Sequence, residues 1–248
     1  MISEAVLWMK YLSIAFNLLT TIPVRAPADW RAGDSGRAAG WYPFVGLVLG
    51  ILVAAAYTLL GLYFSPFVTA ALALTLWVIL TGGLHLDGLA DCCDGLFHAS
   101  DSQKRLEIMK DSRMGAFGGI GLILALTLKV SALASLPTDR AVPVILLAAT
   151  LGRWFIILAG FQPLARPGGM GADFTSGLRK SALVWGGIIP LGLVIFLGIQ
   201  GVLALGLTSL GVFFVLRFAR ARIGGITGDV FGLVVEVAEI ITLVTLTA

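Results

Sequence analysis

Long apolar segments alternate with tight turns and with longer polar segments along most of this chain. Eight apolar segments stand out, at residues 4–22, 38–60, 67–84, 115–136, 141–161, 181–199, 202–218 and 230–247. Most approach or exceed the roughly 20 residues that an α-helix needs to cross a bilayer. The pattern predicts an all-α polytopic membrane helix bundle with about seven or eight spans, forming a single domain over residues 1–248. The first segment ends at Pro23 and is left open between a span and an interfacial helix.

The composition agrees with a membrane location. Of 248 residues, 58% are hydrophobic and only 12% are charged, whereas soluble proteins carry about 25% charged residues. The 31 glycines fit closely packed membrane helices, because small residues let backbones approach. We expect no cleavable signal peptide, since no basic leader precedes the first apolar segment. The adjacent Cys92 and Cys93 do not form a spaced metal or redox pair and are expected to be small buried thiols.

Basic residues are concentrated in the four long polar segments, at 24–37, 87–114, 162–180 and 217–229. These segments carry thirteen lysines and arginines, whereas the three tight turns carry only Arg140. Cytoplasmic loops of membrane proteins are enriched in Lys and Arg. The bias predicts that the long polar segments, and the acidic residues among them, face the cytoplasm.

Three aspartates follow the third apolar segment at spacings of four and three residues: Asp87, Asp91 and Asp94. On a helix these spacings place the three carboxylates on one face. Carboxylates so close together repel one another unless a cation lies among them. Mg²⁺ takes oxygen ligands and often bridges protein carboxylates to substrate phosphates. The three aspartates therefore predict a metal site, and the alternative is a solvated acidic helix end.

Further charged residues follow within twenty positions of the aspartates. Lys104, Arg105 and Lys110 are candidates for binding a polyanionic substrate, although topology alone also accounts for basic residues here. Asp111 and Arg113 directly precede an apolar helix, and a helix N-terminus favours anions. Arg113 is therefore the stronger candidate for contact with a phosphate, while capping of that helix is the alternative role for Asp111.

Charged residues also interrupt the apolar segments. Lys129 and Arg153 lie inside predicted spans, and Glu236 and Glu239 lie in the last one, after Asp229 at its head. Charges within a membrane face the bundle interior or extend to the interface. We expect the acidic face of the last helix to line the cavity of the aspartate cluster, with Asp229 and Glu236 binding substrate. The alternatives are a structural ion pair of the glutamates with Arg153 or Lys129, and a capping role for Asp229.

Two segments are rich in glycine. They are PGGMGADF at residues 167–174 and GGITGDV at residues 224–230. Glycine lets a backbone pass close to a ligand. Simple turn chemistry explains both segments equally well, so they predict a ligand contact only weakly.

Four stretches together resemble the cobalamin synthase family, whose members are integral membrane adenosylcobinamide-GDP ribazoletransferases. The stretches are FNLLTTIPV, GGLHLDGLADCCDGLF, RLEIMKDSRMGAFG and ITGDVFGLVVEVAE. The resemblance extends over nearly the whole chain, and its central 40 residues are the most specific part. Cys92 and Cys93 stand where small or hydroxyl residues are expected, which leaves the three aspartates intact.

The resemblance implies a reaction and its participants. α-Ribazole, or its 5′-phosphate, displaces GMP from adenosylcobinamide-GDP with the help of Mg²⁺, and adenosylcobalamin or its 5′-phosphate is formed. A pyrophosphate electrophile needs a metal and cations to neutralise developing charge. We expect Asp111 and Arg113 to be catalytic, with Asp111 accepting the proton of the ribazole hydroxyl or orienting that hydroxyl.

The resemblance also implies a location and a set of partners. The chain is expected in the cytoplasmic (inner) membrane of a bacterium or archaeon, with its active face toward the cytoplasm. The expected partners are the two substrates and the bilayer. No nucleic-acid partner is expected, and association of several copies of the chain is left open.

Two other classes of membrane protein compete with this interpretation. A CDP-alcohol phosphotransferase also uses clustered aspartates, but its motif continues with an Ala-Arg pair where Asp94-Gly95 is here followed by Leu96 and Phe97. A secondary transporter would place its ionisable residues near the midplane and show repeated broken helices. Most acidic residues here lie at one predicted membrane face, and no repeat is evident.

Overall fold

The chain is all-helical, as predicted. The computed structural model describes residues 4–137 and 139–247. Within these ranges the helices are α1 (Glu4–Leu19), α2 (Asp34–Arg37), α3 (Tyr42–Leu60), α4 (Pro66–Thr81), α5 (Leu84–Phe97), α6 (Ser102–Ile108), α7 (Ala116–Ser135), α8 (Ala141–Ala159), α9 (Gly169–Gly177), α10 (Lys180–Phe196), α11 (Gly198–Ile223) and α12 (Gly228–Thr245). A short 3-10 turn, Ala39–Trp41, leads into α3.

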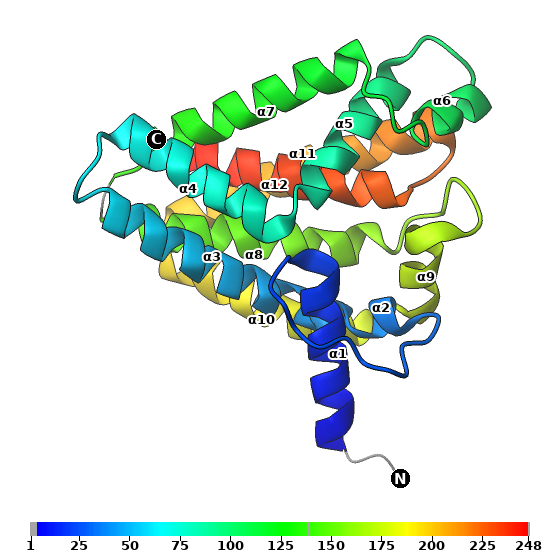
Figure 1. Cartoon of the computed structure of the whole chain (residues 1–248), viewed down its shortest axis with the longest axis horizontal. Helices are drawn as coiled ribbons and strands as arrows, with labels where there is room; N and C mark the ends of the chain where they lie inside the picture. Colours follow the sequence, from blue (N-terminus) through cyan, green and yellow to red (C-terminus); the bar gives the residue numbers. More distant parts are fainter. Residues whose placement is uncertain (1–3, 138, 248) are drawn as a thin grey trace.

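Within the described residues, four helical stretches are long and apolar enough to cross a membrane, or up to six if each bent helix pair counts as one span. The four are Ala39–Leu60, α7, α8 and α11, and the bent pairs are α4 with α5 and α9 with α10. The predicted number of seven or eight spans is therefore not confirmed. One reason is that α1 has only 16 residues and runs steeply across the long helices (Figure 1). This orientation is typical of an interfacial helix.

Two helices form the centre of the bundle. α8 packs against α3, α10 and α12, and α12 also packs against α5, α7 and α11. Large apolar side chains that remain exposed lie mainly on the outer helices, as Ile195, Phe196 and Phe213 do. In a bilayer these side chains contact lipid, so the exposed apolar surface does not need a protein partner.

Two glycines turn the aspartate-bearing helix away from the preceding apolar helix. Gly82 and Gly83 have φ values of +63° and +70°. Side chains of L-residues are disfavoured in this left-handed region by roughly 1–2 kcal/mol per residue. The double turn bends the path of α5 by 90° relative to α4. α5 therefore lies against α12.

The segment after Phe218, which we expected to be a loop, is helical as far as Ile223. Arg220 and Arg222 lie in the last turn of α11, where positive charge complements the helix dipole. Gly224, with a φ of +81°, ends the helix in the left-handed conformation that is common at this position. α11 also begins at Gly198, slightly before the predicted turn at residues 200–201.

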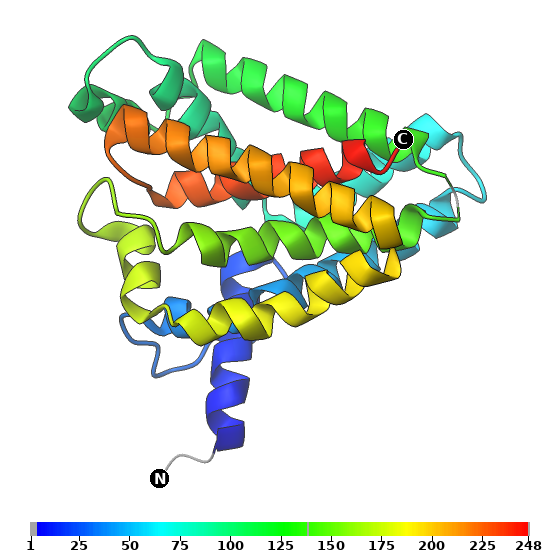
Figure 2. The ribbon, with the colours of Figure 1, turned by 180° about the vertical axis from the view of Figure 1, so that it is seen from behind.

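The connections are sorted between the two ends of the bundle. The four long polar segments lie at the end occupied by α2, α6 and α9, while the tight turns between α3 and α4 and between α10 and α11 lie at the opposite end (Figures 1 and 2). The fold thus gathers the charged connections at one end of the bundle.

Candidate active site

Asp87, Asp91 and Asp94 lie on α5, which is continuous from Leu84 to Phe97, so their spacing places them on one helical face as predicted. A fourth carboxylate, Asp229, joins them from α12, since Asp91 lies within electrostatic range of Asp87, Asp94 and Asp229. More than a hundred residues of sequence separate α5, which carries three of these aspartates, from α12, which carries Asp229.

Close backbone contact between α5 and α12 brings the carboxylates together. A Cβ atom added to Gly88 would lie 2.7 Å from the carbonyl oxygen of Asp229 and 3.1 Å from the Cα of Gly232. Real Cβ atoms essentially never approach other atoms to less than 3.0 Å. Glycine is therefore required at Gly88. Of the acidic face of α12 that was expected to line the cavity of the aspartate cluster, Asp229 lies there, whereas Glu236 and Glu239 are not among the lining residues.

Asp94 differs from the other aspartates in its partners. The backbone N–H groups of Gly115 and Gly118 donate hydrogen bonds of 2.7 and 2.8 Å to its carboxylate. Asp94 therefore caps the N-terminus of α7, which has no side-chain cap from its own N-cap residue, Gly115. Its predicted role as a third metal ligand stays a prediction.

The oxygen-rich donor set of the cluster fits Mg²⁺. Within residues 4–137 and 139–247, no three His, Cys, Asp or Glu side chains lie close enough together to form a complete metal cage. Mg²⁺, however, is commonly held by one or two carboxylates together with substrate phosphates and water. Asp87 and Asp91, one helical turn apart on α5, meet that requirement.

Arg166 is the cation that lies nearest to Asp229. Its guanidinium is 3.6 Å from the carboxylate, and both side chains are only about a quarter exposed, at 26% and 23%. Thr227 also donates a 3.0 Å hydrogen bond to Asp229. Thr227 itself accepts a hydrogen bond from Val230 N–H and is the N-cap of α12, so Asp229 does not cap its own helix. Asp229 therefore pairs with Arg166 and Thr227 while lying within electrostatic range of Asp91 on α5.

The two glycine-rich segments meet beside this ion pair. Ala165 N–H donates to the carbonyl of Ile226, and Ile226 N–H donates to Pro163, each at 2.9 Å. Gly171 approaches so closely that an added Cβ would lie 3.2 Å from Gly228 N. Their similar composition, which predicted little by itself, reflects close packing of one loop on the other.

Asp111 and Arg113 form an exposed ion pair near the cluster. Arg113 Nη2 lies 2.6 Å from Asp111 Oδ2, and Arg113 N–H also donates to Asp111. These hydrogen bonds hold the pKa of the Asp111 carboxyl at about 2. An efficient general base has a pKa near the operating pH, so this geometry favours the expectation that Asp111 orients a group over the expectation that it accepts a proton.

The three other basic candidates differ in their surroundings. Lys104 forms an exposed pair with Glu107 at 3.2 Å, and Lys110 is exposed. Arg105 instead donates hydrogen bonds to the carbonyls of His98 and Arg222, joining the end of α5 to the end of α11. Arg105 therefore has a structural role, and its predicted role in substrate binding stays a prediction.

The charges inside the bundle form a buried cluster. Lys129 Nζ lies 2.6 Å from Glu236 and 2.5 Å from Glu239, and Arg153 donates to Glu239. All four side chains are at most 5% exposed. This is the structural pairing that the sequence left open as the alternative for Glu236. Its predicted role in substrate binding stays a prediction.

A cavity of about 540 Å³ opens beside Asp87 and Asp229. Sequence reasoning did not anticipate the rest of its wall, which includes Trp30, Tyr42, Phe174 and Phe231. These residues come from four separate parts of the chain, and apolar side chains in a membrane protein carry no local mark of a binding site. The two glycine-rich segments, 167–174 and 224–230, were the signals in the sequence near Phe174 and Phe231.

Comparison with known proteins points to one family. The sequence model of the family described as cobalamin-5-phosphate synthase matches residues 11–247. The chain is similar to proteins named adenosylcobinamide-GDP ribazoletransferase: that of Desulfitobacterium hafniense is 39% identical over 95% of both chains, and that of Pseudomonas aeruginosa is 41% identical over 96% of this chain and 98% of its own. That of a Roseiflexus species is 34% identical over 94% and 87%. No solved structure matches the chain.

Proposed function

The chain belongs to the cobalamin-5-phosphate synthase family, and we propose that its aspartate cluster transfers the adenosylcobinamide phosphate group from adenosylcobinamide-GDP to α-ribazole. A ribose hydroxyl of α-ribazole forms a new bond to phosphorus, the bond from phosphorus to GMP breaks, and the proton of the hydroxyl passes to solvent water. The products are GMP and adenosylcobalamin, or adenosylcobalamin 5′-phosphate when α-ribazole 5′-phosphate is the acceptor. Neither a CDP-alcohol phosphotransferase nor a transporter is favoured by the relatives.

One observation carries this assignment to particular residues. Carboxylates from α5 and α12 face one another beside a cavity, at the end of the bundle where the basic segments gather. An acidic group surrounded by cationic loops is suited to a metal ion and an anionic diphosphate. We assign Mg²⁺ to Asp87 and Asp91, with Asp94 and Asp229 beside them. When bound, Mg²⁺ would neutralise charge that develops on the diphosphate.

The charged residues around the cluster have separate roles in the proposed reaction. Arg113, which is 87% exposed and held by Asp111, is placed to reach the diphosphate of a substrate that approaches from solvent. Lys104 and Lys110 lie on and just after α6 and add positive charge at the same end of the bundle. Arg166 holds Asp229 in place through its ion pair. Asp111 orients Arg113 or the attacking hydroxyl rather than accepting the proton.

The active face is assigned to the cytoplasm. The positive-inside bias and the gathering of all long polar segments at one end of the bundle support this orientation. The expected membrane is the cytoplasmic membrane of a bacterium or archaeon, where both substrates would reach the site from inside the cell.

The proposal is tested with purified protein, adenosylcobinamide-GDP, α-ribazole and Mg²⁺, by measuring release of GMP and formation of a cobamide. Asp87→Asn and Asp91→Asn should each reduce Mg²⁺-dependent turnover by on the order of a hundredfold, as removal of a group that stabilises transition-state charge does. Asp139→Asn is the matched control, because Asp139 is exposed near the opposite end of the bundle. Wild-type turnover in both α5 variants would refute the site, and absence of GMP release by the wild type would refute the activity.

A further inference from the structure

The cavity beside the aspartate cluster is lined by two kinds of side chain. Asp87, Asp173 and Asp229 contribute carboxylates to its wall, and α3, α9 and α12 contribute aromatic rings. Its volume of about 540 Å³ lies within the range of roughly 300–1,000 Å³ that is typical of sites enclosing a small ligand. An apolar pocket with a few converging polar groups is the usual form of a binding site for such a ligand.

The aromatic part of the wall is organised by direct ring contacts. Tyr42 and Phe174 are stacked with ring centroids 5.6 Å apart, and Phe231 meets Phe174 edge-on at 5.2 Å. Trp30 adds a partly exposed indole to the same wall. Tyr42, Phe174 and Phe231 are at most 9% exposed because they pack on one another, so a flat aromatic ligand would contact their uncovered edges.

We propose that this cavity binds the acceptor nucleoside α-ribazole, with its aromatic base against Tyr42, Phe174 and Phe231 and its ribose toward Asp87 and Asp229. The inference rests on the proposed function. The base supplies a flat ring system for the aromatic part of the wall, and the ribose supplies the hydroxyl that must reach the carboxylate cluster. The corrinoid donor is several times larger than the nucleoside and does not fit this volume. It therefore approaches the same carboxylates from the solvent outside the cavity.

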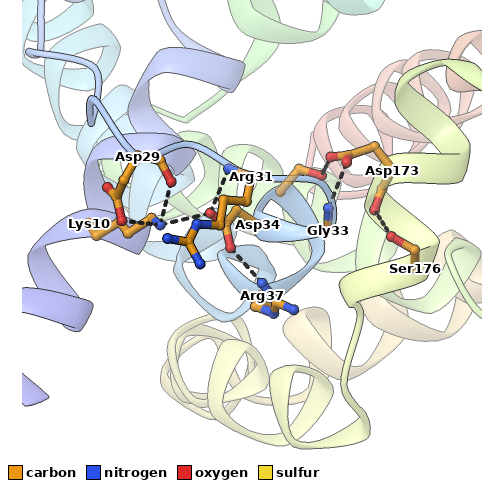
Figure 3. Close-up of polar contacts among 9 residues, drawn as sticks. Lys10, Asp29, Arg31, Gly33, Asp34, Arg37, Asp173 and Ser176 are labelled. Carbon is orange, nitrogen blue, oxygen red and sulfur yellow. Dashed lines mark hydrogen bonds and ion pairs between the residues drawn. The ribbon is translucent and has the colours of Figure 1, made fainter. Parts of the chain in front are cut away.

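The outer wall of the cavity is tied together before any ligand binds. Gly33 N–H donates a 2.6 Å hydrogen bond to Asp173, and Ser35 donates to the other oxygen of the same carboxylate. Figure 3 shows this connection between the segment at the head of α2 and α9. In the same view, Lys10 and Arg37 both pair with Asp34, at 2.9 and 2.7 Å. A wall held in this way loses little conformational freedom on binding.

The test fills the cavity from its edge and measures which substrate is affected. Leu84 lines the cavity and is 40% exposed, so Leu84→Trp adds volume at the site without entering the core. Leu72 has the same exposure of 40% but does not line the cavity, and Leu72→Trp is the matched control. The KM for α-ribazole should rise by on the order of tenfold or more in L84W, the scale of discrimination produced by misfit in an apolar pocket. The KM for adenosylcobinamide-GDP and kcat at saturating acceptor should match those of L72W.

Equilibrium binding of radiolabelled α-ribazole to the detergent-solubilised protein, without donor, gives a second readout. Trp30→Ala should weaken this binding, whereas Trp8→Ala, at an exposed tryptophan that does not line the cavity, should not. This pair decides the question if L84W fails to insert. Unchanged α-ribazole binding in W30A and L84W, or a rise in the KM for the donor alone, would overturn the inference while turnover by the wild type upholds the proposed function. If the wild type itself releases no GMP, the proposed function is refuted rather than the assignment of the cavity.

Discussion

Asp94 and Asp91 lie one helical turn apart on α5, and their neighbours give them different tasks. Both oxygens of Asp94 accept hydrogen bonds from the first turn of α7, whereas Asp91 faces the carboxylates of Asp87 and Asp229. A hydrogen-bonded carboxylate at a helix N-terminus is stabilised by the helix dipole. Facing carboxylates instead repel one another and are suited to a cation. Asp94 therefore anchors the start of α7, whereas Asp91 belongs to a group of carboxylates suited to a cation.

Asp111→Asn should lower kcat without moving the acid limb of the pH–rate profile. The pKa of Asp111 is depressed to about 2 by Arg113, so its carboxylate stays charged at every pH near neutrality and does not titrate there. The variant loses the negative charge and one of the two acceptor oxygens that hold Arg113, which accounts for the lower kcat. The measurement is kcat against pH for wild type and variant. Disappearance of the acid limb in the variant would identify Asp111 as the general base after all.

α12 is held to its neighbouring helices at two positions along its length. Its head meets α5 through Gly88 and Gly232, and its middle is held by Lys129 of α7 and Arg153 of α8 through Glu236 and Glu239. Buried ion pairs repay their desolvation only when the geometry is good, so they act more on the arrangement of helices than on net stability. Here they fix the rotation of the helix that carries Asp229.

Lys129→Met should destabilise the protein by about 3–5 kcal/mol, because it leaves the buried Glu236 carboxylate without its cation. Glu239 still has Arg153, so adding Glu236→Gln in the same chain should recover most of the loss. Lys104→Met is the control, since the exposed Lys104–Glu107 pair contributes about 0–1 kcal/mol. Unfolding in detergent micelles, followed by circular dichroism, measures all three variants. Equal stability of the single and double variants would contradict the role given to Glu236.

The molecule as a whole separates charged and uncharged connections between its two ends (Figures 1 and 2). Under the proposed function this separation has a use, because the donor carries an anionic diphosphate and the metal would arrive from water. The basic loops that predict the orientation in the membrane would then also attract the diphosphate to the aspartate cluster.

Single cysteines at Ser102 and Ser176, in a background lacking Cys92 and Cys93, should resist an impermeant thiol reagent in intact cells. Both serines are exposed and lie in segments expected to face the cytoplasm. A cysteine at Ser65, in the tight turn between α3 and α4, should react readily, because that turn lies at the opposite end. Labelling after cell disruption checks that all three sites are accessible. The reverse pattern in intact cells would place the active face outside.

The sequence by itself determined the membrane-embedded all-α class, the aspartate face of α5, the family and the separation of basic from neutral connections. Each follows from local information: helical period, segment length, residue type and motif. The predicted number of spans is not confirmed, because α1 has only 16 residues and α12 carries three acidic residues. Segment hydropathy alone does not reveal the double glycine turn that sets α5 at 90° to α4.

Only the tertiary structure decided which distant residues meet. Asp229 reaches Asp91, Asp173 binds the segment at Gly33, and Glu239 binds both Lys129 and Arg153. These pairings depend on which helix faces pack together, and that choice is a property of the whole bundle rather than of any window of sequence. The aromatic cavity is the clearest case: its rings are ordinary apolar residues in the sequence, and they form a site only because α3, α9 and α12 converge beside two carboxylates.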